Sequence, residues 1–154
     1  MKQVALVLFG FLALGCASAE VTENRLGPLP ADAKVILASV VIDTQGEVKS
    51  ESDWIEAIQK GFRDEAEDLG IAGGPIPVEI RVTRCDPGSK AERFWVGFGA
   101  GAGHLESTVF VSGHGELVVV GSVSDGFLDG GSFGSVCEKA GRAAARAIGE
   151  ARGK

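Results

Sequence analysis

The sequence contains no tyrosine and only two histidines, and it holds fewer basic than acidic residues. Lys and Arg number 15 against 21 Asp and Glu, which gives a formal net charge of −6. Nucleic-acid binding needs a basic surface that neutralises phosphates, so the charge balance argues against this class of function. The missing tyrosines and scarce histidines leave few side chains for general acid–base chemistry.

The sequence also lacks an apolar run long enough to span a bilayer, which takes about 20 residues. The apolar run 4–14 follows Lys2 and precedes small residues, which is the layout of a secretory signal within 1–19. Cleavage before Cys16 would produce a lipoprotein acylated at that cysteine, whereas cleavage after Ala19 would release a soluble protein. We therefore expect export to the cell envelope, either lipid-anchored in the outer membrane and facing the periplasm or free in the periplasm.

A single domain is expected after the signal, because the remaining chain is long enough for one core and not comfortably for two. Residues 20–33 are polar, contain two prolines and show no periodicity, so they predict a tether. The globular domain is expected to span 34–152. Many of the 23 glycines follow residue 96 and indicate turns and close backbone packing.

Apolar periodicity predicts four strands and two helices. The β-branched run 34–43 is typical of a strand buried on both faces, and 78–85 alternates as a half-buried strand does. Between these strands, apolar residues recur every three or four positions after the helix-start sequence 50–53, which predicts a helix ending at Gly70. The remaining elements are two strands at 105–112 and 117–124 and an alanine-rich helix at 135–151.

The expected fold class is α+β, with a single four-stranded mixed sheet and two packed helices in the order β-α-β-β-β-α. A strand, a helix and a strand in succession favour a parallel pair with a right-handed crossover. The short glycine-flanked link 113–115 predicts a hairpin between the last two strands.

Three cysteines are present, and two of them are available for pairing inside the domain. Cleavage after Ala19 would remove Cys16, and cleavage before Cys16 would leave it acylated. Cys85 and Cys137 remain, and in an oxidising compartment they predict a disulfide, the alternative being two separate buried thiols. The alternation of its strand places Cys85 on the polar side, whereas Cys137 is on the apolar side of its helix, so the pairing requires a twist at the end of the strand. No neighbouring ligand suggests a metal site.

A glycine-rich stretch at 97–102 matches the dinucleotide pattern G-x-G-x-x-[G/A] by letter. That pattern binds a pyrophosphate only between a strand and a helix, and here the following residues predict a strand. Neither a nucleotide nor another cofactor is therefore expected. Trp95, Phe98 and Phe127 are candidates for an apolar binding surface, provided that their side chains are exposed.

No residue is predicted to be catalytic. His104 and His114 would lie roughly 30 Å apart if 105–112 is one extended strand, so a shared site is not expected. Ser122 lies near Asp125 in the sequence, but no motif supplies a histidine partner for it.

The stretch 93–102, Arg-Phe-Trp-Val-Gly-Phe-Gly-Ala-Gly-Ala, precedes a hairpin, a glycine-rich loop and an alanine-rich helix. This arrangement resembles a bacterial family of small envelope lipoproteins whose domain has no known function. The resemblance covers 34–152 and is sharpest at 93–103, while the hairpin turn at 112–116 departs from the Asp and Thr-Gly of the family. It implies an envelope address and a fold, and it carries over no catalytic residue.

The expected function is that of a non-enzymatic module, anchored in a membrane by its lipid, that binds or helps to assemble another envelope protein. The alternative is a small soluble periplasmic enzyme of the hydrolase type. An exposed apolar patch would favour the binding module. A pocket that brings His104 or His114 beside a carboxylate would favour the enzyme.

Overall fold

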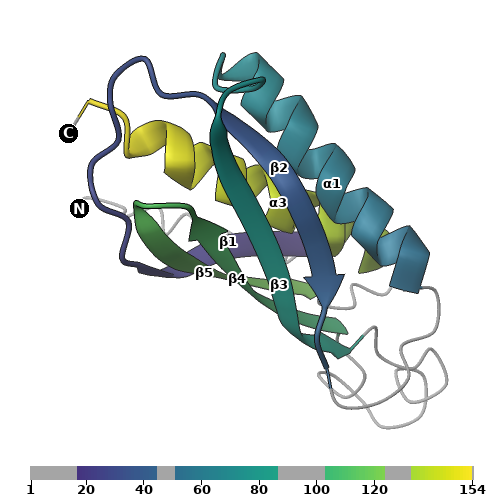
Figure 1. Ribbon diagram of the computed structural model, residues 1–154. Coiled ribbons are helices and arrows are strands. Elements are labelled where there is room, and N and C mark those ends of the chain that lie inside the picture. Colours follow the sequence, from purple (N-terminus) through teal and green to yellow (C-terminus); the bar gives the residue numbers. More distant parts are fainter. Residues whose placement is uncertain (1–16, 45–50, 87–102, 124–132, 154) are drawn as a thin grey trace, which may run out of the picture.

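The computed structural model describes residues 17–44, 51–86, 103–123 and 133–153. In this part of the chain two helices pack against one mixed sheet, so the expected α+β class is confirmed (Figure 1). The sheet has five strands in the order β1-β5-β4-β3-β2, and the expected number of four is wrong by one. Both helices lie on the same side of the sheet (Figure 1).

The additional strand is β1 (Ala17–Asn24), which pairs antiparallel with β5 (Gly115–Val123). Its sequence, ASAEVTEN, is short of the β-branched and aromatic residues that mark strands, so its pairing partner and not its composition makes it extended. The segment 20–33, expected to be a tether, therefore packs on the domain. Leu29 is buried, and its N–H donates to the Ala151 carbonyl at 2.9 Å.

The parallel crossover is confirmed. The strand β2 (Val35–Ile42) leads through α1 (Glu51–Asp68) to β3 (Ile76–Asp86), and β2 and β3 pair in parallel. The register between β3 and β4 (Gly103–Val111) shifts between Val82 and Arg84, so Thr83 is the extra residue of a β-bulge.

The hairpin is confirmed as well, since β4 and β5 pair antiparallel from Gly103 opposite Val123 to Val111 opposite Gly115. The second helix, α3 (Phe133–Glu150), then crosses the sheet over β1 and β5 and packs along α1. The apolar residues of both helices and of one sheet face form a continuous core.

Two glycines bring the helices into close contact. A Cβ atom added to Gly61 on α1 would lie 1.9 Å from the carbonyl oxygen of Glu138, and one added to Gly141 on α3 would lie 2.2 Å from that of Ile58. Each helix thus presents backbone to the other where they cross. This contact holds α1 and α3 together as one layer above the sheet.

Candidate functional site

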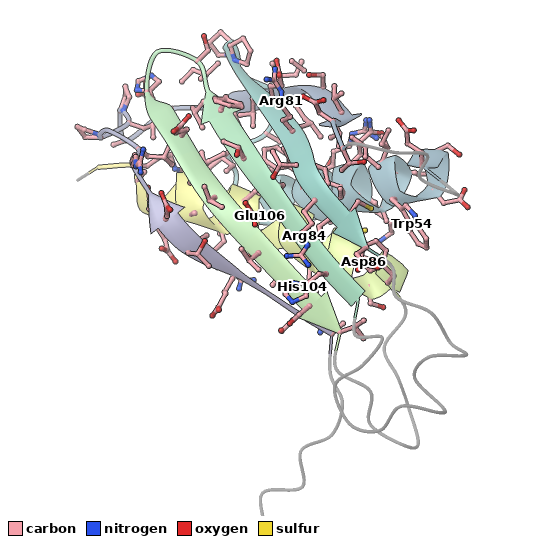
Figure 2. The ribbon with its side chains drawn as sticks, turned by 90° about the horizontal axis from the view of Figure 1, so that it is seen from below. Trp54, Arg81, Arg84, Asp86, His104 and Glu106 are labelled. Atoms are coloured by element: carbon pink, nitrogen blue, oxygen red, sulfur yellow. The ribbon has the colours of Figure 1, made fainter. Side chains whose placement is uncertain are left out.

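Within the described residues, the helices cover one face of the sheet and leave the other uncovered (Figure 2). Along β4 and β5 the residues alternate between buried side chains under the helices and more exposed ones on the uncovered side. We call this second surface the open face. Its side chains on the two central strands are His104, Glu106, Thr108, Phe110, Glu116, Val118, Val120 and Ser122.

A row of polar residues crosses the open face at one end of the sheet. Asp86 on β3 lies directly opposite His104 on β4, which lies opposite Ser122 on β5. Ser122 in turn lies opposite Ser18 on β1, and their hydroxyl oxygens are 3.4 Å apart. Side chains directly opposite each other on neighbouring strands have Cβ atoms about 4.5–5.5 Å apart, so each can reach the next.

The adjacent row pairs opposite charges. Arg84 lies directly opposite Glu106, and both side chains are exposed. Figure 2 shows Arg84, Asp86, His104 and Glu106 close together on β3 and β4, with Arg81 further along β3. Arg81 donates to Glu79 at 3.0 Å.

An aromatic side chain contacts Arg81. The guanidinium carbon of Arg81 lies 5.6 Å from the ring centre of Phe110, which is within range of a cation–π contact. This contact and the bond to Glu79 hold the arginine on the open face. Glu79 and Phe110 lie directly opposite each other in the register of β3 and β4.

Hollows on the described chain lie away from this row. One of about 190 Å³ separates α1 from β2 and is lined by apolar side chains together with Arg63 and Glu67. Another, of about 350 Å³, opens between the starts of α1 and α3 near Lys60 and Glu138. Both are open to solvent, in contrast to the enclosed apolar pockets that usually hold small ligands.

No group of three or more His, Cys, Asp or Glu side chains within the described residues is placed to hold a metal ion. Among the same residues, no helix combines the length and the apolar character that crossing a membrane requires.

The four predicted site residues Cys16, Trp95, Phe98 and Phe127 lie outside the described residues. Of the other predicted positions, Cys137 is fully buried at the start of α3 and Cys85 is half-buried near the end of β3. Both are free thiols, and no Cα atom of α3 lies within 8 Å of one on β3, so the expected disulfide is absent from the structure.

The cysteine thiols are protonated at neutral pH. Burial, aided by the charges of Asp86 and Glu51, raises the pKa of Cys85 to about 11. Burial also raises the pKa of Cys137 to about 12, and the next contribution comes from the charge of Cys85.

The expected separation of the histidines is confirmed by topology. His104 belongs to the start of β4, whereas His114 lies in the turn at the far end of the same hairpin. The sequence-based search missed the row that surrounds His104, because it looked for a motif near Ser122. The residues of the row are instead brought together by strand register, and the bulge at Thr83 sets the position of Asp86.

Comparison with known proteins gives a family. Residues 59–148 match a domain of unknown function, DUF4410. The chain belongs to this family. Among curated proteins, none matches the chain.

Two solved structures of PelC dodecamers from Paraburkholderia phytofirmans show a distant likeness to this chain. One, a variant in space group C2, is 12% identical, covers 86% of this chain and 97% of its own, and has a TM-score of 0.49. The other, in space group P6, is 10% identical, covers 83% and 96%, and has a TM-score of 0.44. At these values the likeness does not extend to function.

Proposed function

We propose that this chain is a non-enzymatic module of the bacterial cell envelope, anchored through Cys16, that binds another envelope protein on the open face. The observation that carries the proposal is that, in the part of the chain that the structure describes, helices cover one face of the sheet and nothing covers the other (Figure 2). The sequence contributes the secretory signal and the family resemblance.

The start of β1 supports cleavage before Cys16. Ala17 is only 5% exposed, and its carbonyl accepts a hydrogen bond from the Lys139 ammonium group on α3. Ser18 contacts the Ser122 hydroxyl. Cleavage after Ala19 would remove these residues and shorten the strand, whereas cleavage before Cys16 leaves β1 whole and places the domain directly beside its lipid.

The anchor is tested by the intact mass and the N-terminal peptide of the protein isolated from its native envelope. We expect an acylated peptide that begins at Cys16, and we expect a Cys16→Ala variant to lose the acylation. An unmodified mature protein that begins at Glu20 would contradict the anchor.

The charges of the open face indicate a protein partner. Across one row, Glu20 lies opposite Val120, Val120 opposite Glu106, and Glu106 opposite Arg84. The neighbouring row likewise runs from an acid on β1, through a valine on β5, to an arginine on β3. A surface that places valines among charges of both signs fits another protein better than a nucleic acid or an anionic lipid, which present one sign of charge.

Docking is tested by placing a photo-crosslinking amino acid at Val120 in the anchored full-length protein. We expect one envelope protein to be cross-linked there, and none when the same amino acid replaces Glu67, which is exposed on α1. The partner is then purified and its affinity measured directly. Arg84→Glu should weaken binding roughly 5–10-fold, because it places a like charge opposite the acid of the partner.

A matched charge reversal on the helix layer, Lys60→Glu, serves as the control. Lys60 lies on α1, away from the open face, where it bonds to Asp64. Its reversal should leave the affinity for the partner unchanged. Equal weakening by both variants would contradict docking on the open face.

The row Asp86–His104–Ser122 favours a second candidate function, a hydrolase. The residues follow the order of a catalytic triad, in which a carboxylate orients the histidine and the histidine takes the proton of the serine. Against this function, His104 and Asp86 are exposed on a flat strand surface, whereas such reactions need water-excluded, preorganised donors. The described residues place His104 beside a carboxylate, and they form no pocket around it.

The hydrolase is tested with the purified protein and a p-nitrophenyl ester. If the chain is a binding module, Ser122→Ala and His104→Asn have no effect on the background hydrolysis. A loss of about 100-fold or more in either variant would support the hydrolase instead.

A further inference from the structure

We propose that two copies of this chain pair through the outer edge of β2, as antiparallel strands related by a twofold axis at Val41. The sheet has two edges, one formed by β1 and the other by β2 (Figure 1). Pairing would join two five-stranded sheets into one continuous sheet. It leaves the open face accessible and is therefore independent of the partner that docks there.

The strand β2 is apolar and partly exposed. Among the described residues, the large apolar side chains that are exposed include Ile36 at 52% and Val41 at 44%, and both belong to β2. The sequence of the strand, VILASVVI, contains no charged residue and no proline. A strand edge of this kind is a template for pairing with another chain, and natural proteins usually protect their edges with charged side chains or bulges.

The opposite edge of the sheet is protected in this way. The strand β1 carries Glu20 and Glu23, and both side chains are exposed. Its register with β5 also shifts between Val21 and Glu23. Charges and an irregular register together disfavour the addition of a further strand to β1. The unprotected edge of the sheet is therefore the one formed by β2.

The chain itself covers the start of the β2 edge. The N–H of Val35 donates to the carbonyl of Ile71 at 2.7 Å, and the carbonyl of Val35 accepts from Gly74 at 3.2 Å. The irregularity in the register of β2 also lies in this half of the strand, between Leu37 and Ser39. Only the second half of the edge is consequently suited to pairing.

In that second half the backbone groups of Val40 and Ile42 point outward. The N–H of Asp43 donates to the carbonyl of Val82 on β3 at 2.8 Å, so Asp43 faces β3. Backbone groups alternate along a strand, so Val40 and Ile42 face away from β3. In the part of the chain that the structure describes, no backbone group bonds to them on this outer side.

A second copy of β2 satisfies these groups and matches the side chains. With the axis at Val41, the two outward residues Val40 and Ile42 of one copy exchange hydrogen bonds with Ile42 and Val40 of the other. Val41 lies opposite Val41 of the second copy, and Ser39 lies opposite Asp43, so a hydroxyl group meets a carboxylate. No like charges oppose each other along the pair, and this self-complementarity favours a second copy over an unrelated chain.

The closing experiment replaces Val41 by cysteine in the full-length protein, which is purified in detergent and treated with a mild oxidant. Residues in a non-hydrogen-bonded antiparallel pair have Cα atoms about 4.5 Å apart, a separation that a disulfide bridges. We expect Val41→Cys to form a covalent dimer that reduction reverses. Ser112→Cys, at an exposed position in the hairpin turn, should stay monomeric, as should the wild-type protein.

Absence of the dimer, or an equal yield from Ser112→Cys, would overturn the proposal. The same holds if Val41→Cys is cross-linked in the native envelope to a different protein and forms no covalent dimer, because the edge then belongs to that partner.

Sedimentation of the full-length protein in detergent provides a second measurement. We expect the wild-type protein to form a dimer that dissociates on dilution. Val41→Arg should raise the Kd of the dimer about 10-fold or more, because it places two like charges opposite each other. Leu69→Arg changes another exposed apolar residue, away from β2, and should leave the Kd unchanged. A monomeric wild-type protein, or equal effects of the two variants, would contradict pairing through β2.

Discussion

The closest contact between α1 and α3 depends on two residues that lack a side chain. Gly61 and Gly141 each face a backbone carbonyl of the other helix, at distances that leave no room for a methyl group. Glycine in the middle of a helix lowers helix stability by roughly 1 kcal/mol relative to alanine. At these two positions the close packing of the helices offsets that loss. The glycine content of the chain reflects this packing as well as its turns.

Gly141→Ala should lower the free energy of unfolding by about 2–4 kcal/mol, because its Cβ atom would lie 2.2 Å from the carbonyl oxygen of Ile58 and force the helices apart. Urea unfolding followed by circular dichroism measures the change. Gly149→Ala is the matched control on the same helix, since its Cβ atom would meet only the end of the Leu69 side chain, at 3.1 Å. A loss of similar size in the control would show that helix packing at Gly141 is not the cause.

At the scale of elements, a group of charges joins α1 to α3. Glu65 on α1 is buried and accepts hydrogen bonds from the Nε and the terminal nitrogen of Arg146 at 3.0 and 2.9 Å. It also accepts one from Arg142 at 3.4 Å. The side chains of Arg142 and Arg146 are 32% and 59% exposed, respectively, so they remain hydrated while the carboxylate does not. The buried acid is therefore the critical member of the group.

Glu65→Gln should lower the free energy of unfolding by about 1–3 kcal/mol, because it removes the charge that the two arginines stabilise and leaves a buried amide with poorly matched partners. The measurement is again urea unfolding. Glu67→Gln, an exposed change two positions further along α1, should stay within about 0.5 kcal/mol of the wild-type protein. Equal effects of the two substitutions would contradict the role assigned to Glu65.

For the whole molecule, the titratable groups define a range of pH in which the fold is most stable. The hydrogen bond from Lys60 lowers the pKa of both Asp64 and Glu138 below their ordinary values of 3.8 and 4.5. This stabilisation is present above the ordinary values and is lost as the pH falls through the lowered ones. Because these side chains are largely exposed, the acid effect should be small and should weaken further with salt.

The stability of the fold at alkaline pH depends on the two cysteine thiols. The pKa values of Cys85 and Cys137 are raised from an ordinary 9.0 to about 11 and about 12, chiefly by burial. The resulting stabilisation is complete below pH 9 and is lost as the pH rises through the folded values, because the unfolded thiols ionise first. The reduced protein should therefore unfold at lower urea concentration at pH 10 than at pH 7.

The Cys85→Ser/Cys137→Ser variant has no thiol in the domain to ionise, so its urea midpoint should change much less over the same range of pH. A parallel decline in the wild-type protein and the variant would assign the alkaline loss to other groups.

The sequence by itself determined much of the element order. The apolar run of β2, the alternation of β3 and the periodicity of α1 are local patterns, because burial on one or both faces repeats with the period of the element. The hairpin followed from its short glycine-flanked link for the same reason. The family resemblance was also visible without a structure.

Tertiary structure decided what local patterns do not contain. The strand β1 is extended because β5 offers it a free edge, and its own composition does not predict this. The row of Asp86, His104 and Ser122 depends on the register of three strands and on one bulge, which sequence spacing does not specify. The same bulge turns Cys85 toward the side of the sheet that the helices cover, because one extra residue in a strand reverses the face of every residue after it.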